Sequence, residues 1–157
     1  MAARRTVPRI VLAGDHGGVA LKASLAAFLR ERGIPVRDLG TDSAEPVDYP
    51  DYGIAAAAAI RRGEADRAIL ICKSGIGMSI CANKSAGVRA ALVSTVKDAE
   101  LSRRHNDANV LVLSANSLGP VKARRIVSTW LSAPFDGGRH RRRVAKITRF
   151  EKAHWRE

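Results

Sequence analysis

The stretch from Ala68 to Lys84, A-I-L-I-C-K-S-G-I-G-M-S-I-C-A-N-K, joins a short apolar run to a helical segment through a glycine-rich turn. The apolar run ends at Cys72 and predicts a buried strand of a parallel sheet. A strand that passes through a glycine turn into a helix leaves backbone N–H groups unpaired near one point, where the helix dipole adds positive potential. We therefore expect this stretch to bind an anion, or to stabilise one that forms in a reaction.

Reactive groups are concentrated around this turn. Cys72 stands at the carboxyl end of the predicted strand, which is the edge where open α/β sheets bind their ligands. The hydroxyl of Ser74, the backbone of Gly75 and Gly77, and the side-chain amide of Asn83 follow within twelve residues. Together these groups predict an active site.

Parts of the stretch also fit a purely structural role or a nucleotide-binding turn. Cysteine is among the most buried residues, so Cys72 could be a core side chain beside glycines that only permit the turn. A dinucleotide-binding turn requires G-x-G-x-x-G/A, and Gly75 and Gly77 match its first two glycines, but Ile80 occupies the last position. The fingerprint is incomplete, and a lone G-x-G is weak evidence for a nucleotide site.

The composition indicates one globular domain spanning residues 1–157. Its 46% hydrophobic and 27% charged residues are ordinary for such a domain. No apolar run approaches the length of a membrane span, and the first residues lack the apolar core of a signal peptide. Two cysteines nine residues apart do not form a disulfide framework, so we expect a cytoplasmic protein that does not contact a membrane.

The formal net charge of +12 points towards nucleic acid as a partner. Residues 139–157, however, hold eight lysines and arginines against two glutamates, which is half of the excess. Few aromatic residues accompany these charges and no nucleic-acid-binding motif is present, so we expect a basic terminal helix and no nucleic-acid partner. Arg139 and Arg143 lie one helical turn apart and could clamp one phosphate, with a solvated charge run as the alternative.

Short apolar runs alternate with helical patterns along the chain. Asp51 is expected to cap a helix over residues 52–62, and Thr95 and Asp98 to form a capping pair for a helix over residues 96–104. The alternation predicts an α/β fold: a doubly wound, parallel, five-stranded sheet in a Rossmann-like three-layer sandwich, with an extra C-terminal helix. The predicted strands are residues 9–13, 35–39, 68–72, 88–93 and 109–113.

Further polar residues lie near predicted strand and helix ends. Asp15 and His16 follow the first strand in a turn bracketed by glycines, where an Asx turn is the structural alternative. His105 and Asn106 close a helix, a place where both residue types are common. Tyr49 lies in a polar loop, where simple packing would also account for it.

Five stretches, in this order along the chain, are A-G-D-H-G-G, D-Y-P-D-Y, I-L-I-C-K-S-G-I-G-M-S-I-C-A-N-K-S-A-G-V-R-A, L-S-R-R-H-N-D-A-N-V-L and G-G-R-H-R-R-R-V. They resemble the sugar-phosphate isomerases that comprise type B ribose-5-phosphate isomerase and galactose-6-phosphate isomerase, over nearly the whole chain from Ile10 onward. The resemblance implies aldose–ketose interconversion through an enediolate, without a metal or cofactor, on ribose 5-phosphate or a related sugar phosphate.

At matching positions, the resemblance implies that Cys72 is the base that moves a proton between C1 and C2. Ser74 takes the place of a hydroxyl beside the developing oxyanion. Asp15 and His105 match residues that handle the sugar hydroxyls, with His105 similar to a ring-opening histidine. The remaining matches are substrate contacts: Gly75, Gly77 and Asn83 in the anion hole, His16, Arg139 and Arg143 at the phosphate, and Tyr49 and Asn106 in the pocket.

The resemblance also implies a homodimer, or a dimer of dimers, in which the His105 segment comes from the neighbouring subunit. The basic helix of residues 139–157 has no strand after it, so we expect it to pack at a subunit interface, with docking on its own core as the alternative. Two positions depart from the family pattern: Lys73 stands where glycine is common, and Asn116 where many ribose-phosphate members have an arginine at the phosphate. These departures imply an altered grip on the phosphate, with Lys73 among the substrate contacts. They leave open whether the sugar is a pentose, a hexose or shorter.

A non-catalytic sugar-phosphate binding protein on the same fold is the main alternative, and a basic nucleic-acid-binding domain is a weaker one. A binding protein needs no carbon base. The presence of Cys72, Ser74 and His105 together therefore favours the enzyme.

Overall fold

The computed structural model describes residues 7–155 and contains one parallel sheet with the strand order β2-β1-β3-β5-β4. Every neighbouring pair of strands in it is parallel. The predicted doubly wound, five-stranded fold is therefore confirmed, with β2 and β4 shorter than expected. The strands are β1 (Ile10–Gly14), β2 (Val36–Asp38), β3 (Arg67–Cys72), β4 (Ala90–Leu92) and β5 (Val110–Ser114).

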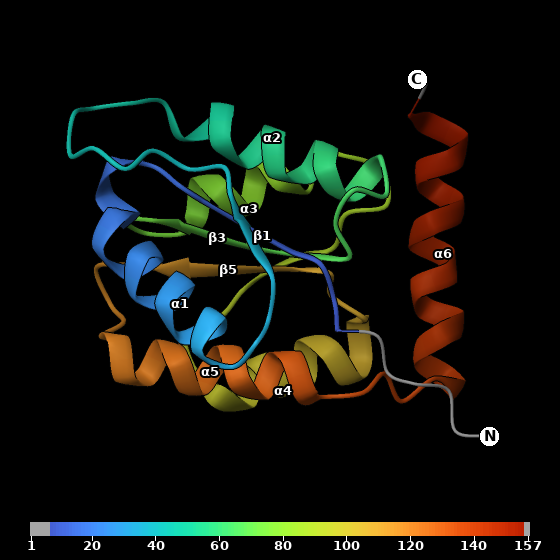
Figure 1. Cartoon of the computed structure of the whole chain (residues 1–157). Helices are drawn as coiled ribbons and strands as arrows, with labels where there is room; N and C mark the ends of the chain where they lie inside the picture. Colours follow the sequence, from blue (N-terminus) through green and yellow to red (C-terminus); the bar gives the residue numbers. More distant parts are fainter. Residues whose placement is uncertain (1–6, 156–157) are drawn as a thin grey trace.

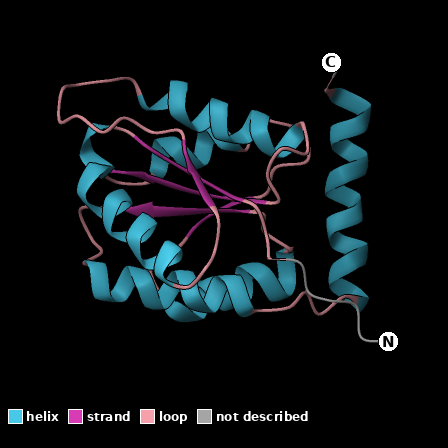
Figure 2. Cartoon of the chain, in the orientation of Figure 1, coloured by secondary structure: helices cyan, strands magenta, loops and turns pink. Residues whose placement is uncertain are grey.

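Helices cover both faces of the sheet, as Figure 1 shows. Helices α1, α4 and α5 pack on one face, and α2 and α3 pack on the other, which makes the three layers of the sandwich (Figure 2). The helices are α1 (Val19–Glu31), α2 (Tyr49–Arg61), α3 (Ile76–Ala82), α4 (Val96–Asn106), α5 (Pro120–Ser132) and α6 (Gly138–His154), with a short 3₁₀ turn η1 (His16–Gly18) before α1.

The central strands are buried on both faces, as their unbroken apolar runs require. Successive side chains of a strand point to opposite faces. In β3, Ile69 and Ile71 face the α1, α4 and α5 layer, whereas Leu70 and Cys72 face α2 and α3. The thiol of Cys72 is thereby placed beneath the start of α3.

Two predicted helix starts have different outcomes. The expected capping pair is confirmed: the Asp98 N–H donates to the Thr95 hydroxyl oxygen at 3.0 Å, and that hydroxyl donates to the Asp98 carboxylate at 2.7 Å. The prediction that Asp51 caps a helix is wrong, because α2 begins at Tyr49 with Asp48 at the N-cap position. Asp51 lies in the first turn instead, where its negative charge still suits the helix dipole.

Helix α6 stands beside the sandwich, next to the amino ends of the strands and away from their arrowheads (Figure 1). It contacts α4, and the buried carboxylate of Glu151 accepts a hydrogen bond from the Gly87 N–H at 3.1 Å. Its side chains Ile147 and Phe150 are exposed, at 47% and 59%. Among residues 7–155, no helix has the length and apolar character needed to cross a membrane.

Candidate active site

The turn between β3 and α3 aims a backbone N–H at the thiol. The side chain of Cys72 is buried, and the N–H of Gly75 donates to its sulfur at 3.1 Å. Gly75 has a φ of +78°, a left-handed conformation that glycine adopts most easily. The hydroxyl oxygen of Ser74 accepts a hydrogen bond from the Ile76 N–H at 3.2 Å. Ser74 is exposed and comes two residues after Cys72 in the sequence.

Two more N–H groups at the start of α3 are unused. The N–H groups of Gly77 and Met78 donate to no acceptor within residues 7–155, because they belong to the first turn of the helix. They lie on the same turn as the Gly75 N–H that reaches the sulfur. This turn therefore offers donors to an anion that forms beside Cys72.

The end of β5 holds the turn in place. The N–H of Ala115 donates to the Cys72 carbonyl at 2.9 Å. The carbonyl of Lys73 accepts two hydrogen bonds, from the Ser114 hydroxyl at 2.7 Å and from the Asn116 N–H at 3.0 Å. The backbone on both sides of the thiol is thus fixed to the neighbouring strand.

Asp15 and His16 lie at the same edge of the sheet as Cys72. The Asp15 N–H donates to the carbonyl of Ile71 in β3 at 3.3 Å, and the Asp15 carboxylate accepts from the Gly17 N–H at 2.9 Å. Nδ1 of His16 accepts from the Val47 N–H at 3.2 Å, which leaves Nε2 as the nitrogen that carries the proton of the neutral ring. The edge thus groups a carboxylate, an imidazole and a thiol.

The side chain of Lys73, the residue after Cys72, extends towards the turn that holds Asp15 and His16. A methyl group added at Gly17 would stand 2.4 Å from Cγ and 3.2 Å from Cε of Lys73, so the lysine chain lies against the Gly17 backbone. The residue is exposed, and its ammonium forms no ion pair or hydrogen bond with any part of the chain that the structure describes. It is an unpaired cation beside the grouped residues.

The loop that leads to Tyr49 is anchored by a buried lysine that the sequence reasoning missed. Lys22 is 1% exposed and binds the carboxylates of Asp38 and Asp42, the latter at 2.8 Å. Burial alone would lower the pKa of Lys22, but its hydrogen bonds to Asp38 and Asp42 outweigh that effect and leave the pKa raised. Tyr49 itself lies against Gly77 in the first turn of α3.

Asn83 is not brought into this group, which corrects the prediction that it lines the anion hole. It caps the C-terminal end of α3, opposite to the Gly75 end. Its side-chain N–H donates to the Ala90 carbonyl at 2.9 Å, and its oxygen accepts from the Ala90 N–H at 2.8 Å. Both functions of the amide are therefore used to attach α3 to β4.

His105, Arg139 and Arg143 form a second group, where α4 meets α6. The ring of His105 stacks on the ring of His140, with centroids 4.1 Å apart and planes inclined by 3°. Burial and the positive charges of His105, Arg139 and Arg143 lower the pKa of His140. The sequence reasoning missed His140, although it lies inside the G-G-R-H-R-R-R-V stretch between the two arginines.

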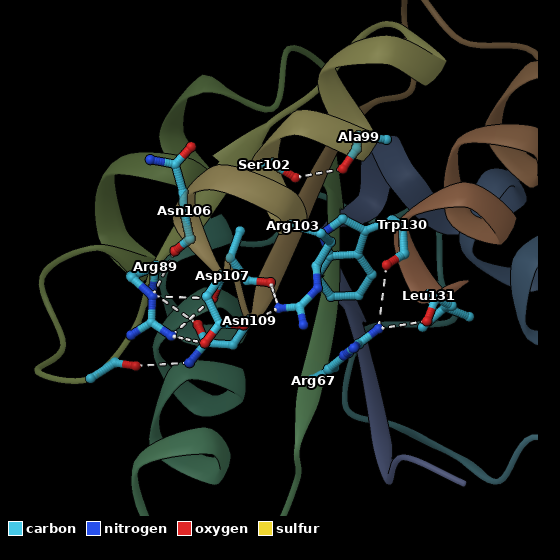
Figure 3. Close-up of polar contacts among 12 residues, drawn as sticks. Arg67, Arg89, Ala99, Ser102, Arg103, Asn106, Asp107, Asn109, Trp130 and Leu131 are labelled. Carbon is cyan, nitrogen blue, oxygen red and sulfur yellow. Dashed lines mark hydrogen bonds and ion pairs between the residues drawn. The ribbon is translucent and has the colours of Figure 1, made fainter. Parts of the chain in front are cut away.

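The C-terminal end of α4 is fixed by a network of arginines, shown in Figure 3. Asp107 has a φ of +47° and follows the last residue of the helix. Arg89 donates to the carbonyls of Asn106 and Asp107 at 2.8–3.1 Å, and Arg103 pairs with the Asp107 carboxylate at 2.8 Å. Burial lowers the pKa of Arg103, and Asp107 opposes that effect. The network holds the Asn106 and His105 segment rigidly.

The two groups lie at opposite edges of the sheet. Cys72 is paired with Ser114 at the carboxyl end of β5. His105 comes just before the amino end of that strand, where the Asn109 carbonyl accepts from the N–H of Ala68. The strand between the two ends rises by about 13 Å. One chain therefore does not bring His105 to Cys72.

His105, Asp136 and His140 have the composition of a metal site, with ligand atoms within 4.8 Å of one another. Their geometry does not suit one. A metal binds a histidine nitrogen in the ring plane at about 2.0–2.1 Å, and no ion can lie in both planes of two parallel rings stacked 4.1 Å apart. The Asp136 carboxylate is also held by Arg104 Nε at 3.0 Å. The arrangement is a stacked pair.

Comparison with known proteins decides the family. The family model described as Ribose/Galactose Isomerase matches residues 10–147. The chain belongs to this isomerase family. Ribose-5-phosphate isomerase B of Escherichia coli is 48% identical over 143 residues, which are 91% of this chain and 96% of that protein. The probable ribose-5-phosphate isomerase B of Mycoplasma pneumoniae is 42% identical, over 91% of this chain and 95% of that protein.

Solved structures of isomerases in this family have the same fold. Ribose-5-phosphate isomerase B from Clostridium thermocellum superposes with a TM-score of 0.91 at 49% identity, over 93% of this chain and 99% of that one. The enzyme from Mycoplasma genitalium, which was solved with ribulose 5-phosphate bound, has a TM-score of 0.88 at 41% identity, over 92% and 96%. The fold and the family assignment of this isomerase chain therefore agree.

Proposed function

We propose that this isomerase interconverts an aldose phosphate and its ketose phosphate, with ribose 5-phosphate and ribulose 5-phosphate as the leading pair. The observation that carries the proposal is the buried thiol of Cys72, which receives the Gly75 N–H at 3.1 Å beside unused N–H groups. The relative from E. coli is named for ribose 5-phosphate, and the M. genitalium structure holds ribulose 5-phosphate, which supports this choice of sugar.

In this proposal the thiolate of Cys72 takes the proton from C2 of the open-chain aldose and returns it to C1. The intermediate is an enediolate, whose oxygen charge lies beside the N–H groups of Gly77 and Met78 and the hydroxyl of Ser74. Preorganised donors of this kind contribute about 10²–10³-fold to a rate. A well-placed base contributes about 10²–10⁴-fold. Asp15, at the same edge, is the candidate to handle the proton that moves from O2 to O1.

Phosphate contacts and ring opening need cations and an imidazole, which His16 and Lys73 supply only in part. The group of His105, Arg139 and Arg143 has the missing chemistry but lies at the opposite edge of its own sheet. We infer that a second copy of the chain supplies this group, so that a homodimer contains two shared sites. The exposed apolar side chains of α6 support its place at that interface.

The state of the cysteines bears on the cellular compartment of the enzyme. Cys72 and Cys81 are both free thiols, and thiols are kept reduced in the cytoplasm. We place the enzyme in the cytoplasm for this reason.

The test is incubation with ribose 5-phosphate in heavy water. Wild type should form ribulose 5-phosphate and exchange the proton at C2 for deuterium. Cys72→Ala should lose both reactions while it still binds the sugar phosphate, because the base acts in the transition state. Binding without turnover by the wild-type protein would favour a non-catalytic binding protein. Turnover by Cys72→Ala would refute the thiol as the base.

A further inference from the structure

His140 is a buried imidazole that the proposed reaction does not use. It lies in the first turn of α6, is 8% exposed, and covers one face of the His105 ring at 4.1 Å. His105 is itself half-buried, and the nearly parallel stack on the buried His140 ring restrains both rings, because a tilt of one ring needs the other to move. The ring plane of His105 is therefore determined in part by a residue 35 positions away in the chain.

The element that carries His140 is docked firmly on α4. The backbone N–H of Asp136, just before α6, donates to the Arg104 carbonyl at 3.0 Å, and the Asp136 carboxylate accepts from Arg104 Nε at 3.0 Å and 3.2 Å. This clamp lies one residue away from His105 on α4. The charged and titratable groups around the stack are, from α4, Arg104 and His105, from the preceding loop, Asp136, and from α6, Arg139 and Arg143.

This neighbourhood keeps His140 uncharged. Two protonated imidazoles 4.1 Å apart would repel each other, and Arg139 and Arg143 add further positive charge. Burial and these charges lower the pKa of His140, so that it is neutral at neutral pH. A neutral, flat side chain can support a neighbouring ring without competing with it for a proton.

We propose that His140 is a positioning residue, which fixes the plane of the His105 ring so that His105 can open the sugar ring in the site of the partner subunit. The inference rests on the proposed function of His105. In ring opening, His105 takes the proton of the anomeric hydroxyl, the bond from C1 to the ring oxygen breaks as C1=O forms, and the ring oxygen receives the proton from the imidazolium. The step conserves atoms and charge and needs no other reactant.

The two directions of the reaction separate this role from a purely structural one. Ribose 5-phosphate is mainly a closed ring and must be opened. Ribulose 5-phosphate cannot close a five-membered ring, because the oxygen that would close it carries the phosphate. A residue that serves ring opening therefore affects turnover of the aldose and spares turnover of the ketose.

The experiment measures initial rates with each sugar phosphate for wild type, His140→Ala, His140→Phe and His154→Ala. His154 is the matched control, because it also stacks in α6, on Phe150 at 4.2 Å. We expect His140→Ala to lower kcat for ribose 5-phosphate about 10- to 100-fold, as a misplaced catalytic group does, with little change in KM. Its kcat for ribulose 5-phosphate should stay within about threefold of wild type.

His140→Phe preserves a flat ring, so it should restore most of the aldose turnover, and His154→Ala should resemble wild type. An equal loss for both sugars, no loss in His140→Ala, or a loss in His140→Phe as large as in His140→Ala would overturn the inference. His105→Ala tests the proposed role of His105 separately from the role of His140. If that variant shows no selective loss with the aldose, the proposed role of His105 fails, and the role of His140 fails with it.

Discussion

The ring of Tyr49 occupies the space directly above the α-carbon of Gly77. A methyl group added to Gly77 would stand 2.5 Å from Cζ and 2.9 Å from the hydroxyl oxygen of the tyrosine. Tyr49 is the first residue of α2, and Gly77 lies in the first turn of α3. The contact therefore ties the start of α2, and the loop that leads to it, to the N–H groups proposed to stabilise the enediolate.

Gly77→Ala should displace the Tyr49 ring and raise KM for the sugar phosphate about tenfold, because the added methyl group has no room unless the ring moves. Steady-state kinetics on the single variants and on the double variant with Tyr49→Ala provide the measurement. If the glycine acts through the tyrosine, the double variant will be no worse than Tyr49→Ala alone. Additive losses would show that the two residues act independently.

Subunit mixing tests the shared site. Cys72→Ala and His105→Ala should each be inactive with ribose 5-phosphate. After the two are unfolded together at equal concentration and refolded, half of the dimers are mixed and each mixed dimer has one intact site, so about a quarter of wild-type activity should return. Mixing without subunit exchange is the control. Activity that stays at the level of the separate variants would contradict a site built from two chains.

Lys73→Met should weaken binding of the sugar phosphate, because it removes an exposed, unpaired ammonium at the edge of the sheet that holds Cys72 and Asp15. We expect KM to rise about tenfold at low salt, as for the loss of one charged hydrogen bond. The difference should shrink at high salt, where exposed charges are screened. Lys84→Met is the matched control, since Lys84 is exposed beyond the far end of α3. Equal KM values for Lys73→Met and wild type at low salt would place the ammonium outside the site.

Lys22→Met should destabilise the fold. It retains most of the aliphatic chain but leaves the carboxylates of Asp38 and Asp42 without their buried partner. We expect the free energy of unfolding in urea to fall by about 1–3 kcal/mol. Lys97→Met, which removes an exposed surface pair with Glu100, should cost much less, because such pairs contribute little to stability. A loss no larger than that of the surface variant would show that the buried contacts contribute little.

His140 should make stability depend on pH. Its pKa is lower in the folded chain than in the unfolded chain, so the unfolded chain binds more protons in the interval between the two values. The contribution is complete above the ordinary histidine pKa of about 6.5 and is lost as the pH falls through the folded value. Urea unfolding at about pH 7 and about pH 5 should therefore show a smaller loss for His140→Phe than for wild type. Equal losses would contradict the direction of the shift.

The fold could be predicted because its determinants are local. Short apolar runs and helical patterns alternate, and a parallel sheet then requires that Asp15, Cys72 and Ser74 end up at one edge. Helix starts were harder: Asp48 and Asp51 are chemically alike, and a proline between them suits the first turn of the helix that the structure shows.

The parts of the site that could not be predicted depend on partners distant in the sequence. A side-chain amide beside a glycine turn suits an anion hole, and only the position of Ala90 in β4 shows that Asn83 is already bonded at both of its polar atoms. His140 lies in a run of arginines that resembles a solvated helix face. Its stack on His105 exists only because α6 folds back onto α4.

The hydrogen bonds between Asn83 and Ala90 fix the C-terminal end of α3 to the edge strand β4, and the N–H groups proposed to stabilise the enediolate lie at the other end of the helix. The helix is only seven residues long and is closely packed on the sheet, so a shift at one of its ends is felt at the other. We therefore expect substitutions in β4 that leave the protein folded to change the rate of the reaction proposed at Cys72, although none of these residues would touch the sugar.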